Sequence, residues 1–487
     1  MRSGVTPVVV ALDVGTSSVR ALLYDRRGRS LPGAEVHLPY RPHLAADGTA
    51  EVDAERLLAL VETALDRVLR GGRHEVLGVG ISTFWHGLLG IDARGRPATP
   101  LWLWSDSRSW RQAESLKRRL DAPAIHRRTG CPLHPSYWPA KLAWAGPRAA
   151  ARWTSFADFL CLRLFGEWGT SLSMASGTGL CSLRGRAWDG PLYEALSVKG
   201  SQLPPLVSAP YQGLRPSYAR RWPALARVPW APAAGDGALA NLGSGCTTPK
   251  LRALTIGTSG ALRVITEALP RRLPRELWCY RLDAERLVLG GSFSNGGNLY
   301  AWMLQNLRLD AAGLERRLAR MPPAATGLTF LPLLAGERSP HFAAHATGAI
   351  AGLTLSTSAL DIARAGLEAI ALDFARVDHS LDQVAPGGEV LVGSGAGLLA
   401  SPAWMQILAD AVGKPLVAGH AREASSRGAA LLALEILGRA PKGHEHQARR
   451  GRTFMPRTEA HRAYQVARRS QERLYRQVLV QGGSAKG

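Results

Sequence analysis

Two tight turns of small polar residues, each set between apolar stretches, have the composition of phosphate-binding loops. The first turn consists of Gly15, Thr16, Ser17 and Ser18, and the second consists of Gly257, Thr258 and Ser259. A turn of this kind directs several backbone N–H groups toward one point and forms a concavity suited to phosphate. A single Gly-Thr-Ser triplet is typical of any tight turn. Because two occur in matched apolar contexts, we expect two related halves that grip a polyphosphate from both sides.

Two aspartates near these turns have the chemistry that phosphoryl transfer needs. Asp13 precedes the first turn, where a carboxylate can hold a Mg²⁺ that bridges phosphate oxygens. Asp236 lies between Gly235 and Gly237, whose small size lets a substrate hydroxyl approach. Transfer from ATP to an alcohol needs a carboxylate that accepts the hydroxyl proton, so we predict Asp236 as the general base. Taken alone, Asp13 also suits a turn or a cap, and Asp236 an ordinary Asp-Gly turn.

Two further glycine-rich stretches, residues 290–298 and 393–397, each follow an apolar run and precede a predicted helix. At such a point the backbone can approach a ligand closely, so both stretches are candidates for a nucleotide site. Either is equally compatible with a plain turn between a strand and a helix.

Polar residues stand among aromatic ones in the first half, where Trp85 precedes His86 and Trp104 lies close to Asp106. Indole rings pack against the C–H surface of a sugar, while carboxylates and imidazoles bond its hydroxyl groups. These four residues are therefore candidate sugar contacts. The structural alternatives are a satisfied core histidine at position 86 and a helix N-cap at Asp106.

The surrounding pattern predicts mixed sheets flanked by helices. Residues 53–69 and 357–381 have the spacing of amphipathic helices, and residues 75–83 have the pattern of a buried strand. Functional residues of such α/β folds gather where strands end. We place a boundary between two domains, 1–245 with the sugar site and the first phosphate turn, and 246–487 with the nucleotide site. The basic run 449–476 has the spacing of a C-terminal surface helix.

Composition sets the broad class. At 487 residues, 46% of them hydrophobic, the chain can bury a large core in each of two or more domains. The first apolar run is too short for a membrane span and lacks the cleavage pattern of a signal peptide, so we expect a cytoplasmic protein. The five cysteines are widely spaced and form no Cys-x-x-Cys pair, which predicts buried, reduced thiols rather than disulfides or a zinc site.

The formal net charge of +22 suggests a nucleic-acid partner. The basic residues are mostly arginines scattered through the chain, as a composition bias produces, and no nucleic-acid-binding motif accompanies them. We therefore expect a solvated basic surface that attracts anionic substrates, with no nucleic-acid and no membrane partner.

Together these motifs resemble the FGGY family of carbohydrate kinases, from Val8 to about Leu437. Both phosphate turns and Gly235-Asp236-Gly237 match the family's order, and residues 348–368 follow its C-terminal signature except at Gly366. The resemblance implies an α/β, two-domain actin-like and hexokinase-like ATPase fold, with ribonuclease H-like mixed sheets flanked by helices. It also implies a kinase that uses ATP and Mg²⁺ and whose domains close to exclude water.

The same resemblance assigns further roles. It implies that His86 and Asp106 contact the substrate, that Asp236 is the base, and that Gly297, Gly397 and Ser401 border the adenine nucleotide. Four stretches, residues 128–135, 175–180, 235–243 and 334–340, are most similar to gluconate kinases, and xylulose kinases share much of them. The expected substrate is thus gluconate, with xylulose or another polyol or ketose as the alternative. A catalytically silent sugar- or nucleotide-binding regulator is a further alternative, and a homodimer is left open.

Overall fold

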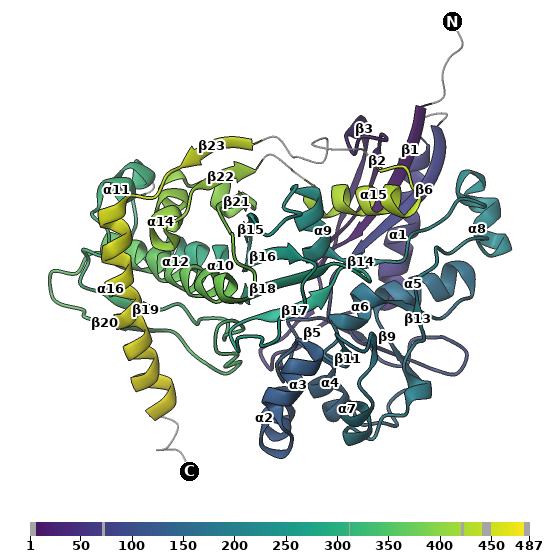
Figure 1. Cartoon of the computed structure of the whole chain (residues 1–487), viewed down its shortest axis with the longest axis horizontal. Helices are drawn as coiled ribbons and strands as arrows, with labels where there is room; N and C mark the ends of the chain where they lie inside the picture. The colour runs from purple at the N-terminus through teal and green to yellow at the C-terminus, as the bar shows by residue number, and fades with distance from the viewer. Residues whose placement is uncertain (1–5, 71–73, 311, 420–422, 441–449, 482–487) are drawn as a thin grey trace, which may run out of the picture.

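Two mixed sheets, one in each half of the chain, organise the protein (Figure 1). The computed structural model describes residues 6–70, 74–310, 312–419, 423–440 and 450–481. The first sheet has the order β14 (Ala234–Gly235), β6 (His74–Thr83), β1 (Thr6–Val14), β2 (Ser18–Tyr24) and β3 (Ser30–Pro39). The second has the order β17 (Trp278–Arg281), β18 (Leu287–Phe293), β16 (Gly260–Thr266), β15 (Leu251–Ile256), β21 (Val390–Ser394), β22 (Leu416–Gly419) and β23 (Arg450–Phe454).

The two sheets share one strand topology. In the first, β1, β2 and β3 are antiparallel neighbours, and β6 and β14 continue parallel to β1 on its other side. In the second, β15, β16 and β18 are antiparallel neighbours, and β21 and β22 continue parallel to β15. The two phosphate turns therefore join equivalent hairpins, β1–β2 and β15–β16. This equivalence confirms the prediction of two related halves.

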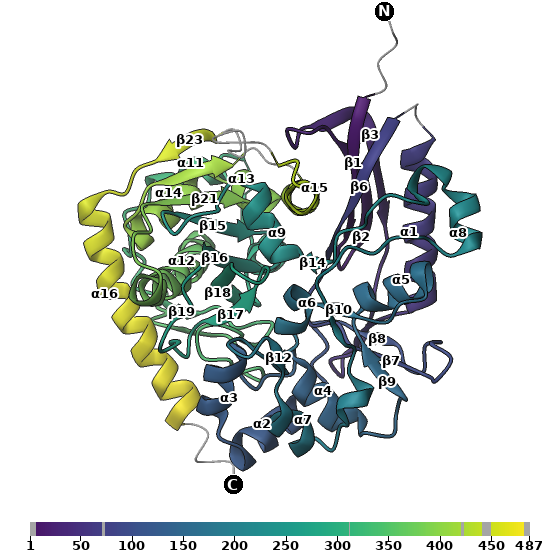
Figure 2. The same ribbon diagram turned by 45° about the vertical axis from the view of Figure 1, so that its right-hand side comes forward.

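The first half carries further short elements, many of which build the lower part of Figures 1 and 2. The strands are β4 (His43–Leu44), β5 (Ala50–Val52), β7 (Leu89–Ile91), β8 (Leu101–Trp102), β9 (Arg152–Thr154), β10 (Thr170–Ser171), β11 (Cys181–Ser182), β12 (Ala187–Trp188) and β13 (Leu206–Val207). The helices are α1 (Ala54–Leu69), α2 (Trp110–Arg119), α3 (Ala122–Thr129), α4 (Trp138–Ala145), α5 (Phe156–Phe165), α6 (Leu172–Ser176), α7 (Gly190–Ala195), α8 (Pro216–Arg221) and α9 (Asp236–Gly243).

Helix α1 and strand β6 confirm two predictions from periodicity. Asp53 caps α1, because its side chain accepts a hydrogen bond from the Arg56 N–H at 3.0 Å. The helix buries its apolar face, including Leu57, Val61 and Leu65, against the first sheet. Strand β6 covers the predicted residues 75–83 and starts one residue earlier.

The second half holds the helices α10 (Gly297–Asn306), α11 (Leu314–Arg320), α12 (Ala359–Val384), α13 (Ala396–Leu399), α14 (Pro402–Val412), α15 (Ala424–Ile436) and α16 (Thr458–Tyr475), and the strands β19 (Thr329–Leu331) and β20 (Ala349–Ala351). Helix α12 confirms the predicted helix 357–381 and runs three residues further. Ser358 and Asp361 form a reciprocal capping box at its start. Its buried face includes Leu367, Phe374 and Leu381.

The expected basic helix over residues 449–476 is shorter than predicted. Residues 450–454 form β23 on the edge of the second sheet, and α16 begins only at Thr458. Thr453 and Phe454 favour a strand, and Pro456 disfavours helix continuation from it. Residue 449 lies outside the described residues. Helix α16 then runs along the outer side of the second half in both views (Figures 1 and 2).

Helix α15 belongs to the second half by sequence but packs on the first sheet. It lies beside α9 and against β1 and β6, and its residues 429–434 are part of the first hydrophobic core. Figure 2 shows α9 and α15 side by side between the two sheets. The close approach depends on glycine, since a Cβ on Gly243 would stand 1.8 Å from Ala424 O and one on Gly428 would stand 2.0 Å from Leu239 O.

All five cysteines are buried, as predicted. In the part of the chain that the structure describes, no helix combines the length and the hydropathy needed to cross a bilayer.

Candidate active site

The first phosphate turn closes the β1–β2 hairpin. The Gly15 N–H donates to Ser18 O at 2.9 Å, and the Tyr40 hydroxyl donates to Gly15 O at 2.6 Å. Ser18 is buried as the first residue of β2, whereas Thr16 is half-buried and Ser17 is exposed at the tip. The result is a narrow loop with accessible hydroxyl groups.

The second phosphate turn meets the other glycines predicted for the nucleotide. The Gly257 N–H donates to Ser259 O at 3.0 Å, and the Gly297 N–H donates to Gly257 O at 2.9 Å. A Cβ on Gly397 would lie 3.8 Å from Gly257 O and 3.9 Å from Gly297 Cα. Thr258 is exposed at the tip. The structure therefore brings these residues together at the N-terminal ends of α10 and α13.

Ser401 has a structural task in the fold. Its hydroxyl caps α14 by accepting from the Trp404 N–H at 3.2 Å, and it donates to Glu315 Oε1 at 2.6 Å. The residue is 2% exposed. Because the hydroxyl is already engaged, contact with the nucleotide stays a prediction for this residue.

Asp236 starts α9 directly after β14, at the end of a strand rather than in an open turn. Its Oδ1 accepts a hydrogen bond from the Gly237 N–H at 2.7 Å. Burial, followed by the negative charge of Asp13, raises the pKa of Asp236 to about 6, and the charge of Arg263 opposes the rise. The carboxylate is thus ionised at neutral pH and more basic than an ordinary aspartate.

Asp236 also connects the two hairpins electrostatically. Asp13 lies on β1, and Arg263 lies on β16. The Arg263 side chain donates from Nε to Asn241 Oδ1 at 3.1 Å and from Nη2 to Thr255 Oγ1 at 2.9 Å. The base therefore lies close to one charged residue from each of the two equivalent hairpins.

The surroundings of Asp13 fit a Mg²⁺ ion. Its Oδ2 lies 3.6 Å from Arg20 Nη1, and its Oδ1 is buried without a hydrogen-bond partner. The hydroxyls of Ser82 and Ser426 are also buried and unpartnered, yet near enough to lower the pKa of Asp13, which burial raises. Among the described residues, no three His, Cys, Asp or Glu side chains form a metal cluster. Such a sparse donor set suits Mg²⁺, which uses one or two carboxylates and completes its shell with water and phosphate.

The ring of Trp85 packs against the two glycines that flank Asp236. Its indole N–H donates to Ser173 O at 3.0 Å, and its ring meets the Tyr280 ring edge-on at 4.9 Å between centroids. The residue is 5% exposed. The ring lies so close to Gly235 and Gly237 that neither could carry a larger side chain without displacing it.

His86 is held as a neutral hydrogen-bond acceptor. Its Nδ1 bonds the carbonyl oxygen of Gly177, so Nδ1 carries the proton and Nε2 offers a lone pair. Burial lowers the pKa of His86 to about 3, which keeps the ring neutral at physiological pH. Its backbone φ of 68° is unusual for a residue other than glycine.

Asp106 and Trp104 are both engaged in contacts within the protein. Asp106 accepts from the Ala50 N–H at 3.1 Å and pairs with Arg108 at 2.6 Å, so much of its carboxylate is already bonded. It is not the cap of α2, a position that Ser109 occupies. The half-buried Trp104 ring stacks under the guanidinium of Arg338, with Cζ 4.4 Å from the ring centre.

Residues from both halves meet around these side chains. The hydroxyls of Tyr137 and Tyr280 are 2.6 Å apart, and His126 Nε2 lies 2.8 Å from Leu277 O. The Cys279 N–H donates to Gly130 O at 2.9 Å. Edge strand β17 of the second sheet is thereby bonded to the first half next to the predicted sugar contacts.

Three cations of the site were not predicted: Lys141, Arg263 and Arg338. Lys141 donates to His86 O at 3.0 Å and to Leu103 O at 2.7 Å, and so fixes the backbone of two predicted sugar-binding segments. Burial lowers its pKa to about 7. In the sequence, Lys141 and Arg263 each stand as a single cation inside an apolar stretch. This pattern could have identified them, because a charged side chain is rarely buried without a partner.

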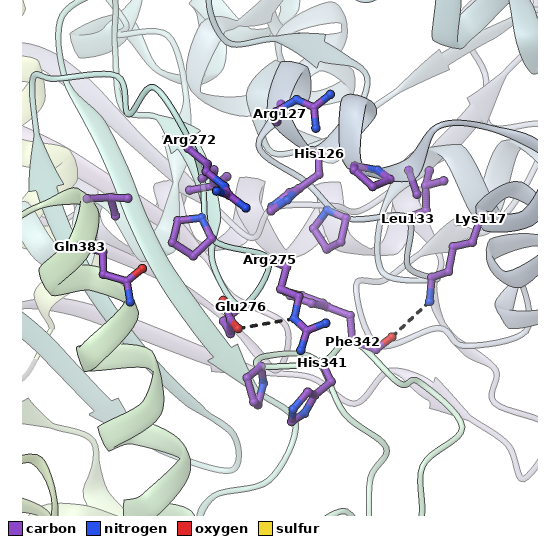
Figure 3. Close-up of a pocket in the computed structure, with 17 residues that line it drawn as sticks. Lys117, His126, Arg127, Leu133, Arg272, Arg275, Glu276, His341, Phe342 and Gln383 are labelled. Carbon is purple, nitrogen blue, oxygen red and sulfur yellow. Dashed lines mark hydrogen bonds and ion pairs between the residues drawn. The ribbon is translucent and has the colours of Figure 1, made fainter. Parts of the chain in front are cut away.

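A cavity of about 830 Å³ lies elsewhere between the halves (Figure 3). Lys117 of α2, His126 of α3 and the segment Pro340, His341 and Phe342 line it. Lys117 Nζ donates to Phe342 O at 3.4 Å across it. Its lining contains no residue predicted for sugar, phosphate or metal, and the chemistry described above is placed on the hairpins and α9.

Comparisons with known proteins agree with this architecture. The models of the FGGY family of carbohydrate kinases match residues 8–243 with the N-terminal domain and residues 253–435 with the C-terminal domain. The gluconokinase of Bacillus subtilis is 28% identical over 460 residues, covering 89% of this chain and 88% of that protein. A glycerol kinase of Aromatoleum aromaticum is 32% identical over 461 residues, covering 87% of this chain and 89% of that protein.

A solved structure extends the likeness to the fold. The crystal structure of gluconate kinase from Lactobacillus acidophilus matches with a TM-score of 0.89 at 26% identity, over 97% of this chain and 98% of that one. This match confirms the predicted two-domain α/β fold.

Proposed function

This chain belongs to the FGGY family of carbohydrate kinases, and we propose that it transfers the terminal phosphoryl group of ATP to a hydroxyl group of gluconate. The environment of the Asp236 carboxylate is the main support for this proposal. The carboxylate has a pKa raised to about 6 and lies near charges from two equivalent hairpins. Such a group is ionised at neutral pH and basic enough to take a proton from an alcohol as the phosphoryl group transfers.

The reaction assigned to Asp236 is a direct transfer. Asp236 orients the acceptor hydroxyl and takes its proton, while the hydroxyl oxygen forms the new bond to the γ-phosphorus. The bond from that phosphorus to the β–γ bridging oxygen breaks, and ADP leaves with the electron pair. The positive charge of Arg263 holds the pKa of Asp236 below the value that burial and Asp13 would impose, so the base stays deprotonated.

We assign the phosphates of ATP to the two hairpin turns. The proposed contacts are Gly15, Thr16, Ser17, Ser18, Gly257, Thr258 and Ser259. Gly297 and Gly397, and Ser401 with less support, are proposed for the rest of the nucleotide. Preorganised backbone N–H groups at such turns stabilise negative charge without reorganising during the reaction.

Asp13 is the residue that we propose to hold Mg²⁺, through its unpartnered Oδ1. When bound, the ion offsets the negative charge of the phosphate oxygens. The negative charge of Asp13 also raises the pKa of Asp236, so the proposed metal site and the general base are linked electrostatically.

On the sugar side, His86 Nε2 accepts a hydrogen bond from a substrate hydroxyl, and the rings of Trp85 and Trp104 pack against C–H groups. Asp106 is proposed as a further contact, through the carboxylate lone pairs that Arg108 does not occupy. Residues 1–245 supply these sugar-binding groups, and residues 246–487 supply most of the nucleotide site. Helix α15 belongs to the second range but packs on the first sheet.

Gluconate is proposed because gluconokinases are among the most similar relatives over nearly the full chain. Xylulose or another polyol or ketose is the alternative, since a glycerol kinase is of comparable similarity. A catalytically silent regulator is disfavoured because both aspartates are present, Asp13 buried and Asp236 half-buried near the charge of Arg263. We place the reaction in the cytoplasm, where buried cysteine thiols stay reduced.

A substrate panel tests the proposal. ADP release is measured by a coupled assay with gluconate, xylulose, ribulose and glycerol at equal concentrations, with the Asp236→Asn variant as the blank for contaminating kinases. We expect gluconate to give the highest kcat/KM. A higher value with a neutral sugar would replace gluconate by that sugar, and no turnover with any acceptor would favour the silent regulator.

A further inference from the structure

Among the described residues, the half-buried Arg338 has no carboxylate at ion-pair distance. It lies between β19 and β20, in the stretch 334–340. Its Nη2 donates to Phe293 O at 3.0 Å, its Nε is buried without a hydrogen-bond partner, and its planar group stacks on Trp104. Burial lowers the pKa of Arg338 to about 10, which leaves it charged at neutral pH.

Among the buried arginines of the second half, Arg252 and Arg364 are neutralised by a carboxylate, whereas Arg263 and Arg281 donate to amide, hydroxyl and carbonyl oxygens. Arg252 pairs with Asp378, and Arg364 Nε lies 2.7 Å from Glu368 Oε1. A desolvated charge without such a partner costs free energy, and a ligand of opposite charge would offset that cost. Arg338 is therefore a place where an anionic ligand gains more than a neutral one.

The position of Arg338 connects this charge with the sugar site. Trp104, on which it stacks, is a proposed sugar contact. Burial is the main cause of the low pKa of His86, and the nearby charges of Lys141 and Arg338 lower it further. Arg338 also lowers the pKa of Asp236, with a smaller effect than that of Arg263.

We infer that Arg338 binds the carboxylate of a sugar-acid substrate and thereby sets the preference for an acid over a neutral polyol. The inference rests on the proposed function and deepens it. The substrate would span the site with its acceptor hydroxyl at Asp236 and its carboxylate at Arg338. The planar guanidinium, held on one face by Trp104, presents its remaining N–H groups in a fork that matches a carboxylate.

The phosphoryl group in transfer is the alternative anionic ligand for Arg338, and kinetics separate the two. We would compare gluconate with glucitol, which has the same carbon chain and no carboxylate, in the wild-type protein and in Arg338→Gln. Loss of the carboxylate contact should raise KM for gluconate about 10- to 100-fold and leave kcat and the glucitol reaction within about threefold. Arg338→Lys, which keeps the charge, should recover part of the gluconate preference.

The control is Arg94→Gln, which removes one exposed arginine of the first half and should leave the preference unchanged. Melting curves establish whether each variant is folded. If Arg338→Gln does not fold, the KM of Arg338→Lys for gluconate is compared with that of the wild-type protein instead.

Each outcome has a distinct meaning. An Arg338→Gln variant that keeps the wild-type preference for gluconate overturns the inference and leaves the kinase assignment intact. An equal fall of kcat with both acceptors assigns Arg338 to the phosphoryl group instead. A wild-type protein that prefers another sugar acid, through Arg338, supports the inference and replaces only gluconate. A wild-type protein that phosphorylates neutral sugars and no sugar acid overturns both.

Discussion

The indole ring of Trp85 fills the space beside Gly235, where an added Cβ would stand 1.9 Å from Trp85 Cε2. The residue before the proposed base is thus fixed by contact with a proposed sugar-binding residue. Since Asp236 follows directly, a shift of either group moves the carboxylate.

Gly235→Ala should therefore overpack the site. We expect a loss of about 1–3 kcal/mol in the free energy of unfolding and a lower kcat. In a Trp85→Ala background the same change should cost less, because the clashing ring is gone, and denaturant titrations of the four proteins give the coupling. Gly190→Ala, where the nearest atom beside the new Cβ would be 3.8 Å away, is the control. Equal costs in both backgrounds would contradict the packing described.

Asp236→Asn should lower kcat by about 10²- to 10⁴-fold, because the amide cannot accept the hydroxyl proton. The KM for ATP should change little, since the phosphate turns are untouched. Steady-state kinetics check both, with the exposed Glu285→Gln as the control for loss of one carboxylate. Retention of most of the activity would remove Asp236 from the role of base.

The acid side of the pH profile should report the raised pKa of Asp236. A base with a pKa of about 6 is protonated below that pH, so kcat/KM should fall about tenfold per pH unit there. Arg263→Gln removes a charge that lowers this pKa, and its acid limb should move to higher pH. The titration of ATP itself is the same for the wild-type protein and for Arg263→Gln. The difference between their two pH profiles therefore reports the pKa of Asp236. Coincident limbs would show that Arg263 does not act on the base.

Asp13→Asn should raise the Mg²⁺ concentration needed for half-maximal activity by at least about tenfold. The amide lacks the negative charge that the ion prefers, although its shape is the same. Activity is measured over a Mg²⁺ titration at fixed ATP, again beside Glu285→Gln. An unchanged Mg²⁺ requirement would place the ion elsewhere.

The sequence alone was sufficient for the framework because its signals are local. The turn residues at Gly15 and Gly257, the periodicity of α1 and α12, and the small residues around Asp236 each act within a few positions of the chain. Their duplication predicted two equivalent hairpins, which the sheet topology confirms. The family resemblance added the order of the two domains.

What the sequence could not supply depends on partners far along the chain. Nothing near Arg338 indicates that it stacks on Trp104, and nothing near Lys141 indicates that it binds the carbonyl of His86. Ser401 shows the converse, because its place before Pro402 is a local signal of a helix cap, which the structure shows. Its contact with the nucleotide, which the resemblance implies, stays a prediction. Asp106 was predicted as a sugar contact, but its bonds to Arg108 and Ala50 arise only in the folded protein.

The crossing of α15 bears on how the protein is made. A ribosome completes β1, β2, β3 and β6 early, yet the helix that covers the apolar surface of β1 and β6 beside α9 ends at Ile436. The first core therefore stays incomplete through most of synthesis, exposed to aggregation or to chaperones. An isolated fragment ending at residue 245 would keep that surface bare, whereas adding residues 423–437 as a separate peptide would supply the missing cover.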